Sequence, residues 1–492
     1  MTISHSTTTL NWDTVFAIPI TEVNRIITEQ KSSPKKFELH DSDRHNFKGE
    51  FKEWQITPGG DGNSIRMKIP VFKFTTYLKG DFLFPKGDYG FQSADLYIQV
   101  KLNYIPQEKS TKNTANEALY DLKMKTDSSD PIDPTVIAIS LKNVEGMFYP
   151  ETFHNTFSDD EMFLKEKFKS QIIRWLQLNL DKFNHTFNVV NLNHHISKDE
   201  PWAWCKPSYV DYAYTDIEGN LNKSLLGVLC MTGGREGGIQ QQQKLDAHVI
   251  PMGSNAGFLI AQERYLENVL LRTLLMKFKN SKIDDYEIIN NSGEAGQYQY
   301  ILQLKDNKTI QLEKVNGDGA EYIPFLKKLK ISLVGDEMRM ESYTETPISA
   351  TGVTAWCETI HHYRIILAKN KKGEQTISYE KTNDPTIRRG TDKDGSGIID
   401  IAKILLLIGG TILSIMTSGA TSFIVGVVVS ILYGILDNLP QLIEMYNVET
   451  SPSIDLMLKS TTSQIIWNAS KTFKLDYAGL AGPLQLGGKF MI

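Results

Sequence analysis

The chain has few cysteines: only Cys205, Cys230 and Cys357 occur in 492 residues. They lie far apart and form no C-x-x-C pair, which excludes a disulfide framework of the kind that stabilises small secreted domains. The first ten residues contain neither a basic region nor an apolar run, so we expect no secretory signal peptide. We therefore expect synthesis in the cytoplasm and, if the protein leaves the cell, release by a non-classical route.

An excess of charge of either sign is also lacking. Lys and Arg number 53 and Asp and Glu number 58, for a net charge of −5, so we expect no nucleic-acid partner. Hydrophobic residues make up 41% and charged residues 23%, which is typical of a folded globular protein. The length exceeds that of one ordinary hydrophobic core and predicts two domains.

Catalytic motifs are missing as well. The sequence contains no H-E-x-x-H, no G-x-S-x-G, no Walker lysine loop and no dinucleotide fingerprint. The pairs His194-His195 and His361-His362 are adjacent, and neighbours on a strand face opposite sides, so we expect neither pair to chelate a metal. We expect no catalytic residues and no cofactor. The open alternative is an enzyme whose catalytic residues are far apart in the sequence and form no local motif.

One weak metal candidate begins at Asp392. Oxygen donors stand at positions 1, 3, 5 and 9 of a calcium loop, namely Asp392, Asp394, Ser396 and Asp400. Position 12, which should supply a bidentate carboxylate, is Lys403. The cation opposes calcium, so the pattern favours a cap and turn leading into the next helix.

Long hydrophobic runs are absent except for one segment, residues 398–440. From Ile404 to Leu436 it carries 33 residues without a charge, interrupted by Gly409-Gly410 and by small polar residues at 417–422. These interruptions favour a buried helical hairpin or bent helix over a membrane span, which needs about 20 continuous apolar residues. Its expected core or groove residues are Leu406, Ile412, Phe423, Val427 and Leu432.

Periodicity predicts an α+β fold. Helical spacing occurs at 20–30, 158–183 and 254–278, and most other segments alternate as strands do. The 58–63 stretch is expected to connect a hairpin, and the glycines at 233–238 with the glutamines at 240–243 to form a flexible loop. The order of short helix, strands, longer helix and strands occurs twice. We therefore predict two halves, 1–250 and 251–492, the second containing the 398–440 segment.

Particular stretches carry a family resemblance. Asn11–Pro19, Trp54–Thr57 and Gly59–Ile65, followed by Asn255–Ile260 and Tyr265–Leu270, make the chain similar to the clostridial OrfX/P47 family. The resemblance implies tandem tubular lipid-binding (TULIP-like) domains, with curved antiparallel sheets wrapped around long apolar helices. It supplies no catalytic residues.

The resemblance also implies a function. Members of this family are encoded beside botulinum neurotoxins or related toxins, so we expect a non-catalytic accessory protein that is released with the toxin components and assists toxin delivery or protection in the host gut. The expected partner is a small sister OrfX protein, and other proteins of the neurotoxin cluster are further candidates. The alternative is binding of a lipid or membrane surface through an apolar tubular groove. For that alternative, the candidate lipid head-group residues are Lys369, Lys371, Lys372, Arg388 and Arg389.

Overall fold

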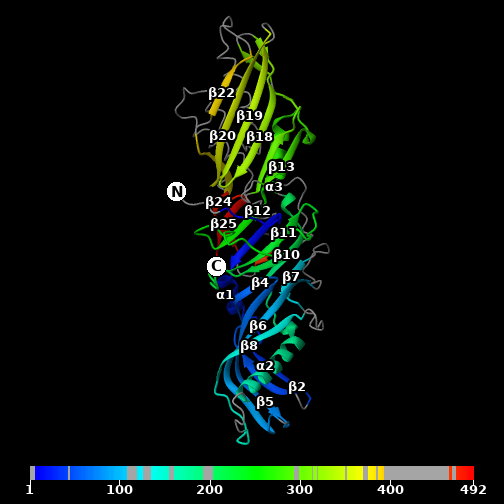
Figure 1. Ribbon diagram of the computed structural model, residues 1–492, viewed down its shortest axis with the longest axis vertical. Helices are drawn as coiled ribbons and strands as arrows, with labels where there is room; N and C mark the ends of the chain where they lie inside the picture. The colour runs from blue at the N-terminus through cyan, green and yellow to red at the C-terminus, as the bar shows by residue number, and fades with distance from the viewer. Residues whose placement is uncertain are drawn as a thin grey trace.

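The computed structural model is elongated and consists of two lobes joined by a waist (Figure 1). It describes residues 6–42, 45–81, 83–107, 119–125, 134–153, 160–191, 203–292, 298–312, 314–317, 320–348, 352–369, 375–383, 386–392, 465–467 and 472–491. We call strands β2 to β8 with helix α2 the lower lobe, strands β13 to β22 the upper lobe, and strands β1, β10 to β12, β24 and β25 the waist. The chain enters the waist three times, at its beginning, its middle and its end.

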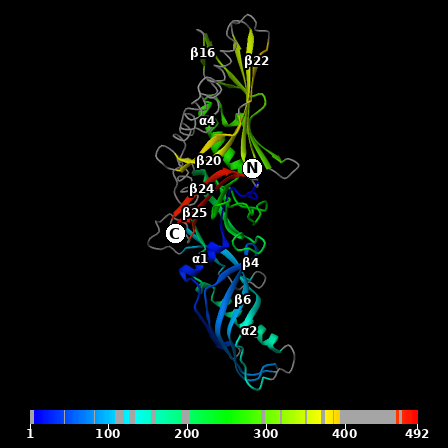
Figure 2. The same ribbon diagram turned by 90° about the vertical axis from the view of Figure 1, so that its left-hand side faces the viewer.

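The waist is one part of a large antiparallel sheet. Strand β1 (Thr14–Pro19) lies between β11 (Leu225–Thr232) and β12 (Ala256–Ile260). Strand β12 pairs with β25 (Leu484–Met491), which pairs with β24 (Thr472–Leu480). On the other side, β11 pairs with β10 (Pro207–Thr215), which meets the lower lobe at β4 (Gln55–Gly62). Figure 2 shows β24 and β25 between the two lobes.

The prediction of a helix beginning at 254 was wrong. Residues 256–260 are strand β12, and the helical segment begins at Gln262. All five residues of β12 are buried, so the strand carries no alternation of apolar and polar positions. A short apolar run of this kind cannot be distinguished from a buried helix by periodicity alone.

The lower lobe is a curved sheet with α2 (Asp160–Leu178) along it. Helix α1 (Ile20–Gln30) joins the waist to this lobe, and both helices fall where the helical spacing predicted them. Burial alternates along most of this lobe's two longest strands, β5 and β6, as a sheet with one buried face requires. The 58–63 stretch lies at a hairpin, as expected, but residues 58–62 form the end of β4 and the chain turns into β5 only at Gly62 and Asn63. The remaining bounds are β2 (Lys36–Ser42), β3 (His45–Phe51), β5 (Ser64–Leu78), β6 (Gly87–Pro106), β7 (Leu119–Met124), β8 (Val136–Glu145), a 3-10 turn (Leu180–Lys182), β9 (Asn188–Asn191) and β23 (Ile465–Trp467).

The upper lobe is a second antiparallel sheet in the order β13-β14-β18-β19-β20-β21. Strand β21 pairs with the C-terminal half of β20, and β22 pairs with its N-terminal half. A helical segment packs near its base and contains a π-helical turn between two α-helical pieces. The bounds are η2 (Ala203–Cys205), α3 (Gln262–Tyr265), the π-turn (Leu266–Leu271), α4 (Arg272–Lys277), η4 (Ile283–Asp285), β13 (Tyr286–Ser292), β14 (Tyr298–Leu304), β15 (Ile310–Gln311), β16 (Val315–Gly317), β17 (Ala320–Tyr322), β18 (Phe325–Val334), β19 (Glu337–Ile348), β20 (Val353–Lys369), β21 (Gln375–Lys381) and β22 (Thr386–Thr391).

The architecture is rich in antiparallel sheet and has few helices among the described residues. The predicted apolar segment 398–440, with Leu406, Ile412, Phe423, Val427 and Leu432, lies outside the described residues. None of the helices that the structure describes is both long and apolar enough to cross a membrane. The predicted boundary between the two halves, at residue 250, falls between β11 and β12 in the sequence. Both of these strands pair with β1, and the boundary stays a prediction.

Candidate functional site

The N-terminal residues 7–13 run across the waist, and we call them the strap. The Thr7 amide and hydroxyl both donate to the Ala481 carbonyl, at 2.6 and 3.0 Å. The Thr8 amide donates to Asp246 Oδ2 at 3.1 Å. The strap therefore joins the loop after β11 to the β24–β25 turn, two segments more than 230 residues apart in sequence.

The glutamine run at 240–243 fixes the strap. Leu10 and Asn11 adopt left-handed φ angles of 51° and 70°, which are unusual for residues other than glycine. Asn11 Nδ2 donates to the Gln240 carbonyl at 2.8 Å, and Trp12 Nε1 donates to the Gln242 carbonyl at 2.8 Å. The Gln242 amide in turn donates to the Leu10 carbonyl at 3.2 Å. The stretch is a loop, as expected, and the strap supplies hydrogen-bond partners for it from more than 220 residues away.

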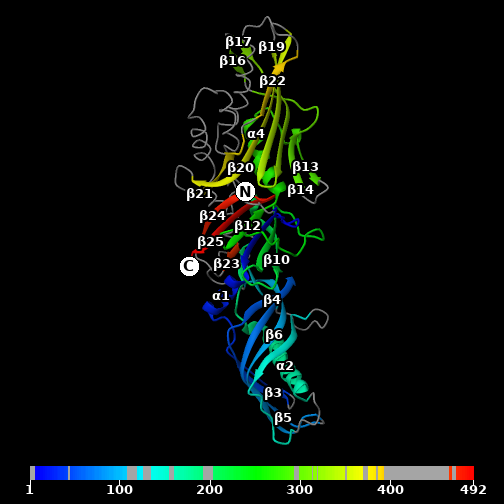
Figure 3. The ribbon, with the colours of Figure 1, turned by 60° about the vertical axis from the view of Figure 1, so that its left-hand side comes forward.

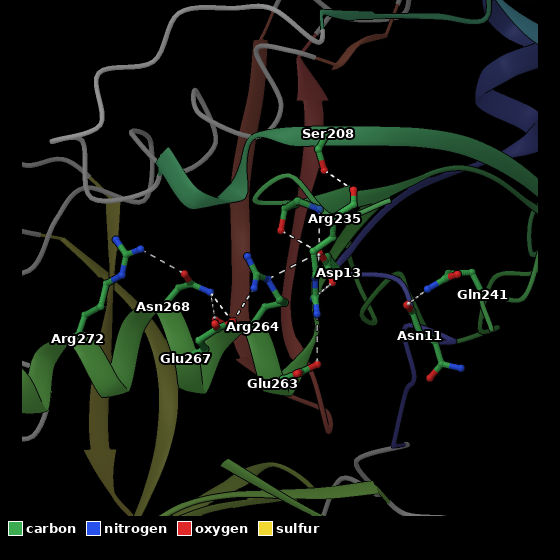
Figure 4. A network of polar contacts seen from close by, with 11 residues as sticks. Asn11, Asp13, Ser208, Arg235, Gln241, Glu263, Arg264, Glu267, Asn268 and Arg272 are labelled. Carbon is green, nitrogen blue, oxygen red and sulfur yellow. Dashed lines mark hydrogen bonds and ion pairs between the residues drawn. The ribbon is translucent and has the colours of Figure 1, made fainter. Parts of the chain in front are cut away.

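Asp13, the last strap residue, is the centre of a buried polar network (Figure 4). Its carboxylate accepts hydrogen bonds from the Thr232 amide at 2.7 Å and the Thr232 hydroxyl at 3.0 Å. Arg235 donates to both carboxylate oxygens of Asp13, through Nε and Nη2. Burial of this carboxylate is thus matched by several donors, as a buried charge requires.

Arg264 extends the network into the upper helical segment. Its Nε lies 3.7 Å from Asp13 Oδ2, and its Nη1 donates to Glu267 Oε2 at 2.6 Å. Gly233 gives this guanidinium room, because a Cβ at that position would lie 2.8 Å from Nη2 of Arg264. The neighbouring thiol of Cys205 is fully buried, and burial raises its pKa well above the usual range, so it is not a nucleophile at neutral pH.

A polar cavity of about 560 Å³ adjoins the network. Its walls come from the strap, the glutamine run, the start of α3, and the turns after β18 and β24. Side chains from these segments that line it include Thr8, Gln241, Asp246, Gln262 and Glu263. The volume suits a small polar molecule or several waters.

The calcium candidate is only partly described. Asp392 Oδ1 accepts a hydrogen bond from the Thr354 amide at 2.7 Å, so this carboxylate joins the end of β22 to the start of β20. Asp394, Ser396 and Asp400 lie outside the described residues. Within the described ranges, no group of three or more His, Cys, Asp or Glu side chains is arranged to hold a metal ion.

The candidate head-group residues do not form one patch. Arg388 and Arg389 on β22 pair with Glu358 and Cys357 of β20, whereas Lys369 is the last residue of β20. The eleven residue-to-residue steps along the strand from Glu358 to Lys369 span roughly 36 Å. Figure 3 accordingly shows β21, which follows Lys369, next to the waist and β22 near the far end. Lys371 and Lys372 lie outside the described residues.

The pair His361-His362 faces opposite sides of β20, as predicted. His362 Nδ1 lies 2.9 Å from Glu337 Oε2. His361 is buried, and neither of its ring nitrogens has a hydrogen-bond partner. Burial lowers the pKa of His361 to about 3. His194 and His195 lie outside the described residues.

Aromatic rings fill the space between α2 and the lower sheet. Phe37 stacks on Phe51 with ring centroids 4.3 Å apart, and Trp175 of α2 packs against both rings. Nearby, Trp54 stacks on Phe183 at 4.6 Å. The chain's own side chains therefore occupy this part of the interior.

Comparison with known proteins decides the family. The OrfX-like family, described as Protein OrfX2/OrfX3/P47, matches residues 9–488. The chain is 49% identical over 490 residues to Protein OrfX3 of Paraclostridium bifermentans, with 99% of both chains covered. The chain belongs to the OrfX2/OrfX3/P47 family. It is also 45% identical over 489 residues, 99% of both chains, to Protein OrfX3 of Clostridium botulinum (strain Kyoto / Type A2). The resemblance seen in the sequence is confirmed.

Solved structures within the OrfX2/OrfX3/P47 family share the fold. The structure of P47 from Clostridium botulinum A2 matches with a TM-score of 0.64 at 15% identity, covering 98% of both chains. P47 of Clostridium botulinum E1 matches with a TM-score of 0.63 at 15% identity, covering 98% of this chain and 99% of that chain. At 15% identity, these matches show that the fold is shared.

The sequence did not point to the Asp13 network. Asp13 and Arg235 are 222 residues apart, so no local motif joins them. The available signal was Asp13 itself, a carboxylate directly before the apolar strand Thr14–Pro19. A charge beside a strand that is buried on both faces requires a partner.

Proposed function

We propose that the chain is a non-catalytic accessory protein of a toxin gene cluster that works by forming a complex with a small sister OrfX protein. Family membership supports the assignment to this class of proteins. The Asp13 network supports a structural role for the waist, because its charged groups bind one another rather than an open reaction site.

The observation that carries this proposal is the filled interior of the lower lobe. Phe37, Phe51 and Trp175 lie in contact between α2 and the sheet and are all buried. An acyl chain would have to displace rings whose burial contributes several kcal/mol. Interactions with partners are therefore assigned to the outer surface of the molecule.

We also propose that the lobes are TULIP-like. In the lower lobe α2 follows a curved antiparallel sheet, and in the upper lobe the segment from Gln262 to Lys277 packs against a second one (Figure 1). Both arrangements agree with the tubular form that the family resemblance implies.

Co-expression with the small sister OrfX protein tests the complex. Gel filtration with light scattering should give a mass equal to the sum of the two chains. A chain that stays monomeric with every sister protein, yet floats with anionic liposomes, would reject the proposal in favour of lipid binding. In that case, replacing Lys369, Lys371, Lys372, Arg388 and Arg389 by alanine should abolish flotation, and native mass spectrometry before and after organic extraction should reveal the bound lipid.

A further inference from the structure

The polar cavity beside the Asp13 network is lined by more acidic than basic side chains. Its charged lining residues are Asp13, Arg235, Asp246 and Glu263. Arg235 donates to both carboxylate oxygens of Asp13, so these two charges offset each other (Figure 4). Glu263 comes only within 3.7 Å of Nη1 of the same guanidinium, and Asp246 has no Lys or Arg partner within the described residues. The carboxylates of Asp246 and Glu263 therefore remain in excess.

Many of the N–H donors around the cavity are already used within the chain. Among the lining side chains, Gln262 Nε2 donates to the Gly482 carbonyl at 2.7 Å, and Gln241 Nε2 donates to the Asn11 carbonyl at 3.3 Å. Five backbone amides of the strap also donate to other groups of the chain, namely those of Thr7, Thr8, Leu10, Trp12 and Asp13. An anion in the cavity would meet excess carboxylates and few free donors, whereas a ligand that donates hydrogen bonds meets open acceptors.

Thr9 adds a hydroxyl to this acceptor-rich wall. It lines the cavity and is 8% exposed, and its hydroxyl has no hydrogen-bond partner among the described residues. A buried hydroxyl without a partner costs free energy unless a molecule beside it completes the hydrogen bond. The Thr9 hydroxyl is therefore available to a ligand in the cavity.

The size of the cavity and its chemical groups favour an organic cation over a metal ion. The volume of about 560 Å³ is far more than a single coordinated ion needs. No group of three or more His, Cys, Asp or Glu side chains in the described part of the chain could hold a metal. Ammonium and guanidinium groups carry several N–H donors and no acceptor, which matches a wall of carboxylates and hydroxyls.

We propose that this cavity binds a small organic cation that carries a primary ammonium or guanidinium group. Its N–H groups donate to the carboxylates of Asp246 and Glu263 and to the Thr9 hydroxyl. The cavity walls belong both to the waist and to the β18–β19 turn of the upper lobe, so a bound cation joins the two. Across this junction the Gly482 amide already donates to the Gly335 carbonyl at 2.7 Å. The site goes beyond the proposed function, and either can fail without the other.

Isothermal titration of the full chain at physiological salt concentration tests the site. The probes are 1,4-diaminobutane and agmatine, with 1,4-butanediol as the neutral control and succinate as the anionic control. The two cations should bind with millimolar or lower dissociation constants, and neither control should bind detectably. Equal binding of the diamine and the diol, or no binding of either cation at about 10 mM, would overturn the proposal.

Two substitutions in the cavity wall locate the cation. Asp246→Asn and Glu263→Gln should each weaken binding at least about tenfold, because each removes one carboxylate. Asp246→Asn keeps a carbonyl oxygen that can accept from the Thr8 amide, so the strap stays in place. The matched control is Glu218→Gln, which alters an exposed carboxylate outside the cavity and should leave the affinity unchanged. Unaltered affinity in both cavity variants would place the cation elsewhere and overturn the site.

Hydrogen exchange on the wild-type chain locates the cation without any variant. The strap amides of residues 8–13 should exchange at least about fivefold more slowly at saturating 1,4-diaminobutane than without it, because the bound cation holds the strap against the upper-lobe turn. The amides of α2, in the lower lobe, should exchange at the same rate in both samples. Binding without slower exchange in the strap would overturn the proposal even if the cavity variants failed to fold.

Discussion

The two lobes share a sheet-and-helix plan but fill their interiors differently. In the lower lobe, rings from the sheet and from α2 meet face to face and edge to face, as Phe74 does with Phe91 and Phe168. In the upper lobe, the buried face of β19 and β20 instead carries Ser342, Thr359 and His361 among its apolar residues. Rings dominate the core of the lower lobe, although Trp54 Nε1 and Gln171 Oε1 are buried there without a hydrogen-bond partner. The buried face of β19 and β20 carries several polar side chains, and the cost of burying them depends on finding partners.

Only some of these upper-lobe polar atoms are paired. The hydroxyls of Ser342 and Thr359 lie 2.7 Å apart and bond to each other. Both ring nitrogens of His361 and the hydroxyl of Tyr363 have no hydrogen-bond partner. The comparison implies that ring packing contributes most to the stability of the lower lobe, and that removal or protonation of polar groups on the buried face of β19 and β20 changes the stability of the upper lobe.

The largest expected effect is in the lower-lobe core. Trp175→Ala should lower the free energy of unfolding by about 4 kcal/mol, because the cavity left beside Phe37 and Phe51 cannot be filled by neighbouring rings. Chemical denaturation measures this loss. Phe163→Ala on the exposed side of the same helix is the control and should change little. A loss below about 1 kcal/mol for Trp175→Ala would mean that the core is not close-packed.

The next effect is at the waist, which holds both lobes. Asp13→Ala should cost about 3 kcal/mol, because it leaves the buried guanidinium of Arg264 and part of Arg235 without their shared carboxylate. The control is Glu218→Ala, which removes an exposed pair with Lys223 and should have no measurable effect. Equal stability of the two variants would show that the Asp13 network contributes nothing.

These features were predictable to different degrees. Helix α1 followed from Ile20, Val23 and Ile26, which lie on one face of a helix. Strand β25 was predicted only as part of a C-terminal stretch, 453–492, of short extended segments, and its bounds were not, because Gly487 and Gly488 are poor strand formers in isolation. Gly487 is required there because a Cβ would lie 2.2 Å from the Pro251 ring, a contact that no local pattern reveals. The Asp13 network was missed for the same reason, since its partners come together only when the waist sheet forms.

Acid should affect both lobes through buried histidines. Burial lowers the pKa of His361 to about 3 and that of His185 to about 4 in the folded state, against about 6.5 when unfolded. Below pH 6.5 the unfolded chain therefore binds more protons, so stability is full above pH 6.5 and falls as the pH decreases. Electrostatic interactions with Lys381 and His362 lower the pKa of His361 further.

His361→Phe isolates the upper-lobe contribution. Between pH 7.5 and pH 5 the wild type should lose about 2 kcal/mol more stability than the variant. The loss begins near the unfolded pKa of about 6.5, and the roughly 1.5 pH units from there to pH 5 correspond to about 2 kcal/mol for one such group. Denaturation at the two pH values gives this difference. Identical pH dependence in the two proteins would mean that His361 is not buried in its neutral form.

The smallest effect gives the sharpest comparison, because one chemical change should have opposite signs in the two lobes. Tyr89 in the lower lobe donates its hydroxyl to the Pro85 carbonyl at 2.7 Å, so Tyr89→Phe loses a hydrogen bond and should destabilise by about 1 kcal/mol. The buried hydroxyl of Tyr363 has no partner, so Tyr363→Phe removes an uncompensated polar group and should stabilise by about 1 kcal/mol. Measuring both at pH 7.5 avoids the histidine titrations. Destabilisation of the same size in both variants would mean that the Tyr363 hydroxyl is satisfied in solution, and the contrast between a paired hydroxyl at Tyr89 and an unpaired one at Tyr363 would not hold.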